Sequence, residues 1–128
     1  MPDAKPKKKI LIIDDEADFT TLVKMNLEKA GDYEVMTENV SSASLNTTKA
    51  FKPDLILLDI LMPVVEGGEV AARLQEDMLT KDIPIVFLTA IVGRDEVKKH
   101  GGLIGGRVFV SKPVDIKELT EIIDKNAK

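Results

Sequence analysis

The most restrictive feature of the sequence is a series of short, unbroken apolar runs, each ending at a polar residue. The runs are "ILII" before Asp14, "LILL" before Asp59, "IVFL" before Thr89 and "VFV" shortly before Lys112. Runs of this length are too short for an ordinary helix and are typical of strands whose two faces are both covered. The chain is therefore predicted to fold around a sheet buried between two layers.

The segments between these runs have helical or alternating periodicity. A further strand is expected at residues 33–38, where "YEVMTE" alternates. We expect strands at 9–14, 33–38, 54–59, 83–90 and 107–112. We expect helices at 16–30, 40–51, 69–77 and 95–100, and a last helix capped by Asp115. Strands that alternate with helices in this way indicate parallel βαβ units, so the predicted fold class is a three-layer α/β sandwich.

Composition excludes several classes of site and of protein. The 128 residues include no cysteine and one histidine, which excludes disulfides and thiolate zinc sites and leaves carboxylates, hydroxyls and lysines for any chemistry. The apolar runs are too short to span a bilayer, which favours a cytoplasmic protein without a membrane contact. The net charge of -4 disfavours a nucleic-acid binder, and the basic run 5–9 is interpreted as part of a solvated tail. We expect a flexible tail at 1–8 and one domain at 9–126.

Polar residues stand at the predicted carboxyl ends of four strands. Asp14 and Asp15 follow the first strand, Asp59 ends the third, Thr89 ends the fourth and Lys112 ends the fifth. Each alone is explained by a turn, a cap or strand propensity, but in a parallel sheet these ends share the edge where ligands bind. Clustered carboxylates need a cation, and Mg²⁺ with a few oxygen ligands is the expected ion. A lysine and a hydroxyl beside them favour phosphoryl transfer, with Asp59 as the nucleophile.

Four ordered motifs resemble one protein family. "ILIIDDE", "DLILLDILMP", "IVFLTA" and "FVSKP" are similar to the motifs of response-regulator receiver domains, and the likeness covers residues 8 to 126. The resemblance implies a flavodoxin-like, doubly wound sheet of five parallel strands in the order 2-1-3-4-5. It also implies a signalling role in a two-component phosphorelay.

The resemblance assigns the acidic residues to phosphoryl acceptance and to metal binding. Asp59 matches the aspartate that accepts a phosphoryl group from a histidine kinase or a histidine phosphotransfer protein. Asp14, Asp15 and Asp59, with the backbone carbonyl of Leu61, match the protein ligands of Mg²⁺. Transfer would be self-catalysed by the acceptor, so the chain is not expected to be an enzyme in the ordinary sense.

The remaining motif residues match a switch. Thr89 matches the hydroxyl that hydrogen-bonds the phosphoryl group, and Lys112 matches the lysine that pairs with it. Phe109 matches an aromatic residue that changes rotamer together with the threonine. The Lys112–Pro113 bond matches one that is cis in the family, and proline makes a cis bond accessible.

Partners are implied by the resemblance alone. The first predicted helix and the loop after Lys112 match the surface on which the phosphoryl donor docks. The helix residues expected on that surface are Phe19, Leu22, Val23 and Asn26. The output is expected to be a protein partner or a phosphorylation-dependent homodimer, with no direct contact to nucleic acid. The chain is expected to be either a single-domain regulator or one piece of a longer protein.

Three single positions and one segment depart from the usual family pattern. Leu61 and Ile91 stand where receivers often carry polar or bulky groups, so either they shield the acyl phosphate and slow its loss or they simply pack. Slower loss in Leu61→Asn than in the wild type would contradict the shield. The four glycines within 101–106 weaken helix formation, which indicates a mobile or remodelled region. Phe109 replaces a common tyrosine and removes a hydroxyl from the signalling surface.

The single histidine and three of the methionines are expected to have structural and not functional roles. His100, which lies beside two lysines and two glycines, is expected to be an exposed loop residue. Met25, Met36 and Met62 are expected to fill gaps in the core.

Two other functions are alternatives to the receiver. A small phosphatase of the haloacid-dehalogenase type would carry an Asp-x-Asp motif and a cap segment, whereas Asp59 is followed by "ILMP". A pseudo-receiver would keep the fold and bind partners without phosphorylation. The presence of all five expected polar residues argues against it, and the unusual 101–106 segment argues for it.

Overall fold

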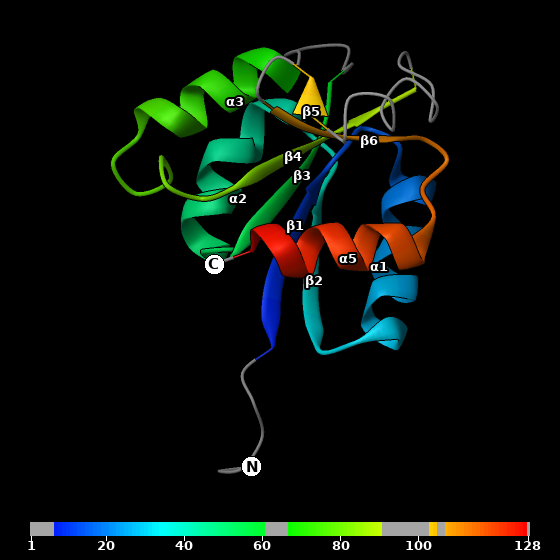
Figure 1. The fold of residues 1–128 in the computed structure, drawn as a ribbon. Helices are drawn as coiled ribbons and strands as arrows, with labels where there is room; N and C mark the ends of the chain where they lie inside the picture. Colours follow the sequence, from blue (N-terminus) through cyan, green and yellow to red (C-terminus); the bar gives the residue numbers. More distant parts are fainter. Residues whose placement is uncertain (1–6, 61–66, 91–102, 105–106, 128) are drawn as a thin grey trace, which may run out of the picture.

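The chain forms an α/β fold around a mostly parallel sheet (Figure 1). The structure is a computed structural model that describes residues 7–60, 67–90, 103–104 and 107–127. Its parallel strands are β1 (Lys8–Ile13), β2 (Tyr33–Glu38), β3 (Leu55–Asp59), β4 (Ile85–Thr89) and β6 (Arg107–Ser111). They lie in the order β2-β1-β3-β4-β6, which confirms the predicted order of five strands. The sequence did not predict β5 (Leu103–Ile104), which pairs antiparallel with β6 at the edge of the sheet.

Helices cover both faces of this sheet. They are α1 (Ala17–Ala30), the 3-10 turn η1 (Ser41–Ala43), α2 (Ser44–Phe51), α3 (Gly67–Glu76) and α5 (Ile116–Asn126). Figure 1 shows α1 and α5 on one face and α2 and α3 on the other. The predicted three layers are therefore confirmed. As expected, the Asp115 side chain caps α5 by accepting a hydrogen bond from the Glu118 N–H.

The strands are stabilised because their side chains are buried on both faces of the sheet. Along β1, Ile10 and Ile12 pack with the α1 and α5 side chains, whereas Leu11 and Ile13 pack with those of α2 and α3. All four are fully buried. Burying each such side chain contributes about 1.5–3 kcal/mol, so an unbroken apolar run is stable only between two covering layers.

The strand register aligns the polar residues at one edge. Ile13 pairs with Leu58, Asp59 with Leu88, and Thr89 with Ser111. Because the strands are parallel, the residues that follow these positions emerge at the same end of the sheet.

The start and end of α1 differ from the prediction in detail. Helix α1 begins at Ala17, one residue later than expected, and Gly31 ends it as predicted. The backbone of Gly31 is extended, with φ at -170°, so a left-handed conformation is not the reason for a glycine here. The reason is the lack of room for a side chain. A Cβ there would come within 2.9 Å of the Tyr33 ring.

The prediction that methionines fill the core is wrong for two of them. Met25 is 50% exposed and Met36 is 40% exposed. Met25 lies on α1 outside the stripe of Phe19, Val23 and Leu27 that faces the core. Met36 lies on an edge strand whose side chains alternate between buried and exposed. The exposure of these two methionines therefore depends on where they lie in the fold and not on their hydrophobicity.

Several expectations fall outside the described residues. These are the helix at 95–100, the tail residues 1–6, His100, Met62, Leu61, Ile91 and the glycine positions 101, 102, 105 and 106. Lys8 belongs to β1, which starts one residue before the predicted strand. In the part of the chain that the structure describes, no helix has both the length and the apolar character needed to cross a membrane.

Candidate functional site

Three carboxylates gather at the carboxyl end of the sheet. Asp14 follows β1 directly and is fully buried, Asp15 is exposed, and Asp59 is the last residue of β3 and is 5% exposed. One carboxylate oxygen from each lies within 4.8 Å of the others. The structure therefore brings together the three acidic side chains that were predicted from the sequence to share a site.

Asp14 is held by the loops around it. Its N–H donates to the Glu38 carbonyl at 3.0 Å, and its Oδ1 accepts from the Glu16 N–H at 3.0 Å. Asn39 donates from its side-chain amide to the Asp14 carbonyl at 2.9 Å and to the Thr20 hydroxyl at 3.0 Å. Asn39 was not selected from the sequence, although it follows β2 at the same edge and the strand-end argument could have found it.

Lys112 lies against these carboxylates. Its Nζ is 2.7 Å from Asp14 Oδ2, 3.0 Å from Glu16 Oε1 and 3.6 Å from Asp59 Oδ1. The ammonium also lies 4.5 Å from the centre of the Phe19 ring, a cation–π distance. Glu16 follows Asp14 and Asp15 in the sequence but was not predicted as a site residue, because spacing alone does not show which acid reaches the lysine.

Burial and charge act in opposite directions at this cluster. Desolvation raises the pKa of the Asp14 carboxyl above its ordinary value, and the Lys112 ammonium and the Glu16 N–H offset only part of that effect. Burial alone would lower the pKa of Lys112, but its ionic contacts with Asp14 and Glu16 outweigh burial and raise the pKa. Within the described residues, the Lys112 ammonium contacts the carboxylates of Asp14, Glu16 and Asp59, and the Asp15 carboxylate lies beside those of Asp14 and Asp59. The site therefore has an excess of negative charge.

Of the other predicted site residues, Thr89 and Lys112 lie at the same edge, whereas Phe109 lies in the middle of β6. Thr89 ends β4, is 1% exposed and pairs in register with Ser111. The Thr89 carbonyl accepts a hydrogen bond from the Lys112 N–H at 2.8 Å, and this bond positions the backbone of Lys112 beside the end of β4. Phe109 stacks on Phe87 with ring centres 5.3 Å apart. The Lys112–Pro113 bond is cis, as the resemblance implied.

The donor set fits a hard divalent cation. Asp14 Oδ2 is buried and, apart from its ionic contact with Lys112, has no partner in hydrogen-bond geometry among the described residues. Carboxylate oxygens that are close together and incompletely paired suit Mg²⁺, which takes one or two carboxylates and completes its shell with water or phosphate oxygens. The fourth predicted ligand, the Leu61 carbonyl, lies outside the described residues.

Comparison with known proteins gives one consistent result. The family model described as "Response regulator receiver domain" matches residues 10–124. The chain is 43% identical over 113 residues to the phosphate regulon transcriptional regulatory protein PhoB of Pseudomonas aeruginosa, a match that covers 88% of this chain and 48% of the relative. It is 38% identical over 113 residues to the alkaline phosphatase synthesis transcriptional regulatory protein PhoP of Bacillus subtilis, covering 88% and 45%.

The chain thus spans about half the length of these curated relatives. Among solved structures it is similar to the chemotaxis protein CheY4 of Vibrio cholerae, with a TM-score of 0.78, 27% identity and coverage of 94% of this chain and 98% of that one.

Proposed function

This chain belongs to the response regulator receiver domain family, which acts in two-component phosphorelay signalling, and from that premise we propose that Asp59 accepts the phosphoryl group. Receiver domains are typically signalling domains and not enzymes. The proposal rests on one observation. Asp14, Asp15 and Asp59 converge on one point, with the Lys112 ammonium beside them.

The geometry supports a carboxylate nucleophile. An Asp59 oxygen would form a bond to phosphorus while the bond from phosphorus to the donor's histidine nitrogen breaks, and the freed nitrogen keeps that electron pair. Asp59 is the last residue of β3, a strand whose residues are all buried, and the strand positions it for this step. Rigid placement of the nucleophile lowers the barrier, because the carboxylate is already oriented before transfer begins.

Neighbouring groups would stabilise the added charge. Lys112 Nζ is 3.6 Å from Asp59 Oδ1, so a small shift brings it to the phosphoryl oxygens. Thr89 would donate its hydroxyl to the same oxygens, and Phe109 would change rotamer with it. Asp14, Asp15, Asp59 and the Leu61 carbonyl would hold Mg²⁺, which supplies neutralising charge when bound.

The donor would be a histidine kinase or a histidine phosphotransfer protein that docks on α1. Leu22 is 58% exposed and suits this role. Val23 is 2% exposed and packs in the core, so the prediction that it lies on the docking surface is wrong. Phe19 and Asn26 are half-buried. In this proposal residues 9–126 form a cytoplasmic receiver domain whose output is a protein partner or a phosphorylation-dependent homodimer.

Intact mass spectrometry tests the proposal. The full chain is incubated with acetyl phosphate and Mg²⁺, and we expect one phosphoryl adduct that is stable in acid and labile in base. Asp59→Asn should carry none. The matched control is Asp82→Asn, because Asp82 is an exposed residue shortly before β4 and should not affect the reaction.

An equal adduct on Asp59→Asn would refute the assignment of the acceptor. A folded wild type that gives no adduct at all would instead support the pseudo-receiver alternative.

A further inference from the structure

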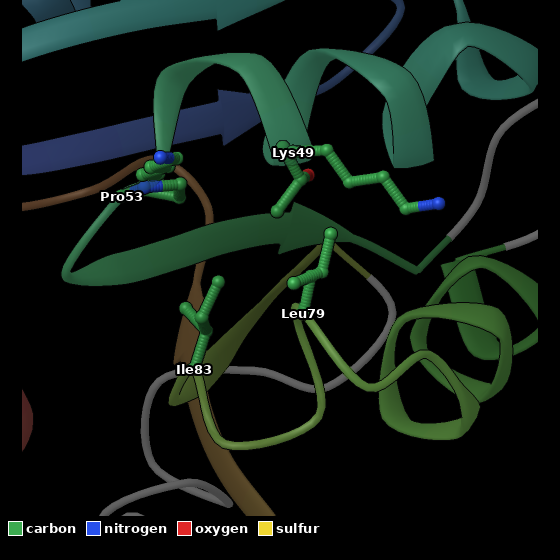
Figure 2. Close-up of a pocket in the computed structure, with 6 residues that line it drawn as sticks. Lys49, Pro53, Leu79 and Ile83 are labelled. Atoms are coloured by element: carbon green, nitrogen blue, oxygen red, sulfur yellow. The ribbon is translucent and has the colours of Figure 1, made fainter.

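We propose that a cavity at the opposite end of the sheet binds a small carboxylate with an apolar body, such as a short-chain fatty acid. The cavity has a volume of about 300 Å³. Its lining residues are Thr48, Lys49, Lys52, Pro53, Leu79 and Ile83. Figure 2 shows that these side chains come from α2, from the turn that leads into β3 and from the segment before β4.

The cavity is separate from the acidic cluster. Pro53 and Ile83 lie just before β3 and β4, whereas Asp59 and Thr89 end those strands. Four residue steps along a strand span about 13 Å. The inference therefore does not depend on the proposed phosphoryl transfer and can fail or succeed independently of it.

The body of the cavity is apolar. Pro53 is buried, Ile83 is half-buried and Leu79 is 75% exposed. The Thr48 hydroxyl donates to the Ser44 carbonyl at 2.7 Å, so its donor is already used inside α2. A volume of 300 Å³ lies at the lower end of the range for small-molecule sites, which limits the ligand to a few carbon atoms.

One of the two lysines is already neutralised. Lys49 Nζ lies 2.9 Å from Asp77 Oδ2, and this contact lowers the pKa of the Asp77 carboxyl. The pair ties α2 to the segment that follows α3, which keeps two walls of the cavity in place. Lys49 is therefore a structural tie and not the charge that a ligand would meet.

Lys52 supplies the charge. Its side chain is exposed and has no ion pair or hydrogen bond with any of the residues at 7–60, 67–90, 103–104 and 107–127. Its backbone has φ of 55° and ψ of 61°, the left-handed conformation that ends α2. Glycine or asparagine adopts this conformation with less strain, so the backbone gives no reason for a lysine here. What lysine adds is an ammonium at the edge of an apolar cavity, and an apolar monocarboxylate is the matching chemistry.

Chemical-shift titration of the ¹⁵N-labelled full chain tests the inference, with hexanoate as the probe and hexan-1-ol as its uncharged counterpart. We expect saturable shifts of the Lys52, Leu79 and Ile83 amides with hexanoate, and weaker binding of the alcohol. Lys52→Gly and Lys52→Asn should each bind hexanoate about three- to fivefold more weakly, the factor expected for one exposed ion pair. Leu79→Ser should also weaken binding.

The variants are chosen to remain folded. Glycine and asparagine suit the backbone at position 52, and Leu79 is exposed, so thermal midpoints should not fall. The matched charge control is Lys29→Ala, an exposed lysine in the last turn of α1, which should bind hexanoate like the wild type. The inference is overturned by the absence of saturable shifts, by equal affinity for the alcohol, by unchanged affinity in both Lys52 variants or by an equal loss in Lys29→Ala.

Discussion

The two ends of the same sheet shift the pKa of a carboxyl group in opposite directions. At the carboxyl end, Asp14 and Asp59 are buried and share Lys112, and burial raises the pKa of Asp14. At the amino end, Asp124 is half-exposed and accepts hydrogen bonds from the Tyr33 hydroxyl at 2.8 Å and from Lys8 at 3.1 Å. These contacts lower the pKa of Asp124, the Tyr33 hydrogen bond most of all.

The difference distinguishes a charge that stabilises the fold from charges that are available to bind a ligand. Asp124 has partners that favour its ionised form, so its charge stabilises the folded chain. Asp14, Asp15 and Asp59 repel one another around one ammonium, so their charges are stabilised fully only when a cation arrives. An acidic cluster that the protein leaves short of positive charge is suited to binding a cation and a phosphoryl group.

Removing one lysine from each end should give the largest contrast. In the presence of a chelator, Lys112→Ala should lower the free energy of unfolding by about 3 kcal/mol, because it leaves buried carboxylates without their cation. Lys8→Ala should cost less than about 1 kcal/mol, because its ion pair is exposed to water. Urea unfolding of both variants measures the difference. Equal losses would mean that the two ends do not differ as described.

Removing the buried hydroxyl at the amino end should have the next largest effect. Tyr33→Phe keeps the ring, which is buried, and deletes the hydrogen bond to the ionised Asp124. We expect the free energy of unfolding at neutral pH to fall by about 1.5 kcal/mol, as for other hydrogen bonds to charged groups. Thermal or urea unfolding checks the value, and no loss would show that Asp124 is satisfied by Lys8 alone.

The same pair predicts a dependence on alkaline pH. Burial, with the hydrogen bond to Asp124, raises the pKa of Tyr33 from 10.0 to about 12. The folded chain therefore holds the phenol proton more tightly than the unfolded chain. This contribution is complete below pH 10 and is lost as pH rises toward 12. Between pH 10 and pH 12, the free energy of unfolding should fall less steeply with pH for Tyr33→Phe than for the wild type.

Neutralising one carboxylate at each end should give effects of opposite sign. Without metal, Asp59→Asn should raise the free energy of unfolding by about 1 kcal/mol, because it removes one like charge from the cluster. Asp124→Asn should lower it, because a favourable charge is lost. Mg²⁺ should stabilise the wild type more than Asp59→Asn. Destabilisation by Asp59→Asn in chelator would contradict a cluster under repulsion.

The sequence by itself determined the fold class and most of the candidate site. Apolar runs such as "ILII" and "LILL" are stable only as strands covered on both faces, so the three layers follow from solvation alone. Parallel strands end at a common edge of the sheet. The sequence alone therefore predicted that Asp14, Asp59, Thr89 and Lys112 lie together at that edge.

Only the tertiary structure decided which of these groups touch. The contact of Glu16 with Lys112 and the bridge from Asn39 to Asp14 join residues from different loops, whose approach depends on strand register and on helix packing. The exposure of Met25 and Met36 was decided in the same way, by the turn of α1 and by the edge position of β2. Local sequence fixes which groups can react at a strand end, but their pairings arise from packing between segments far apart in the chain.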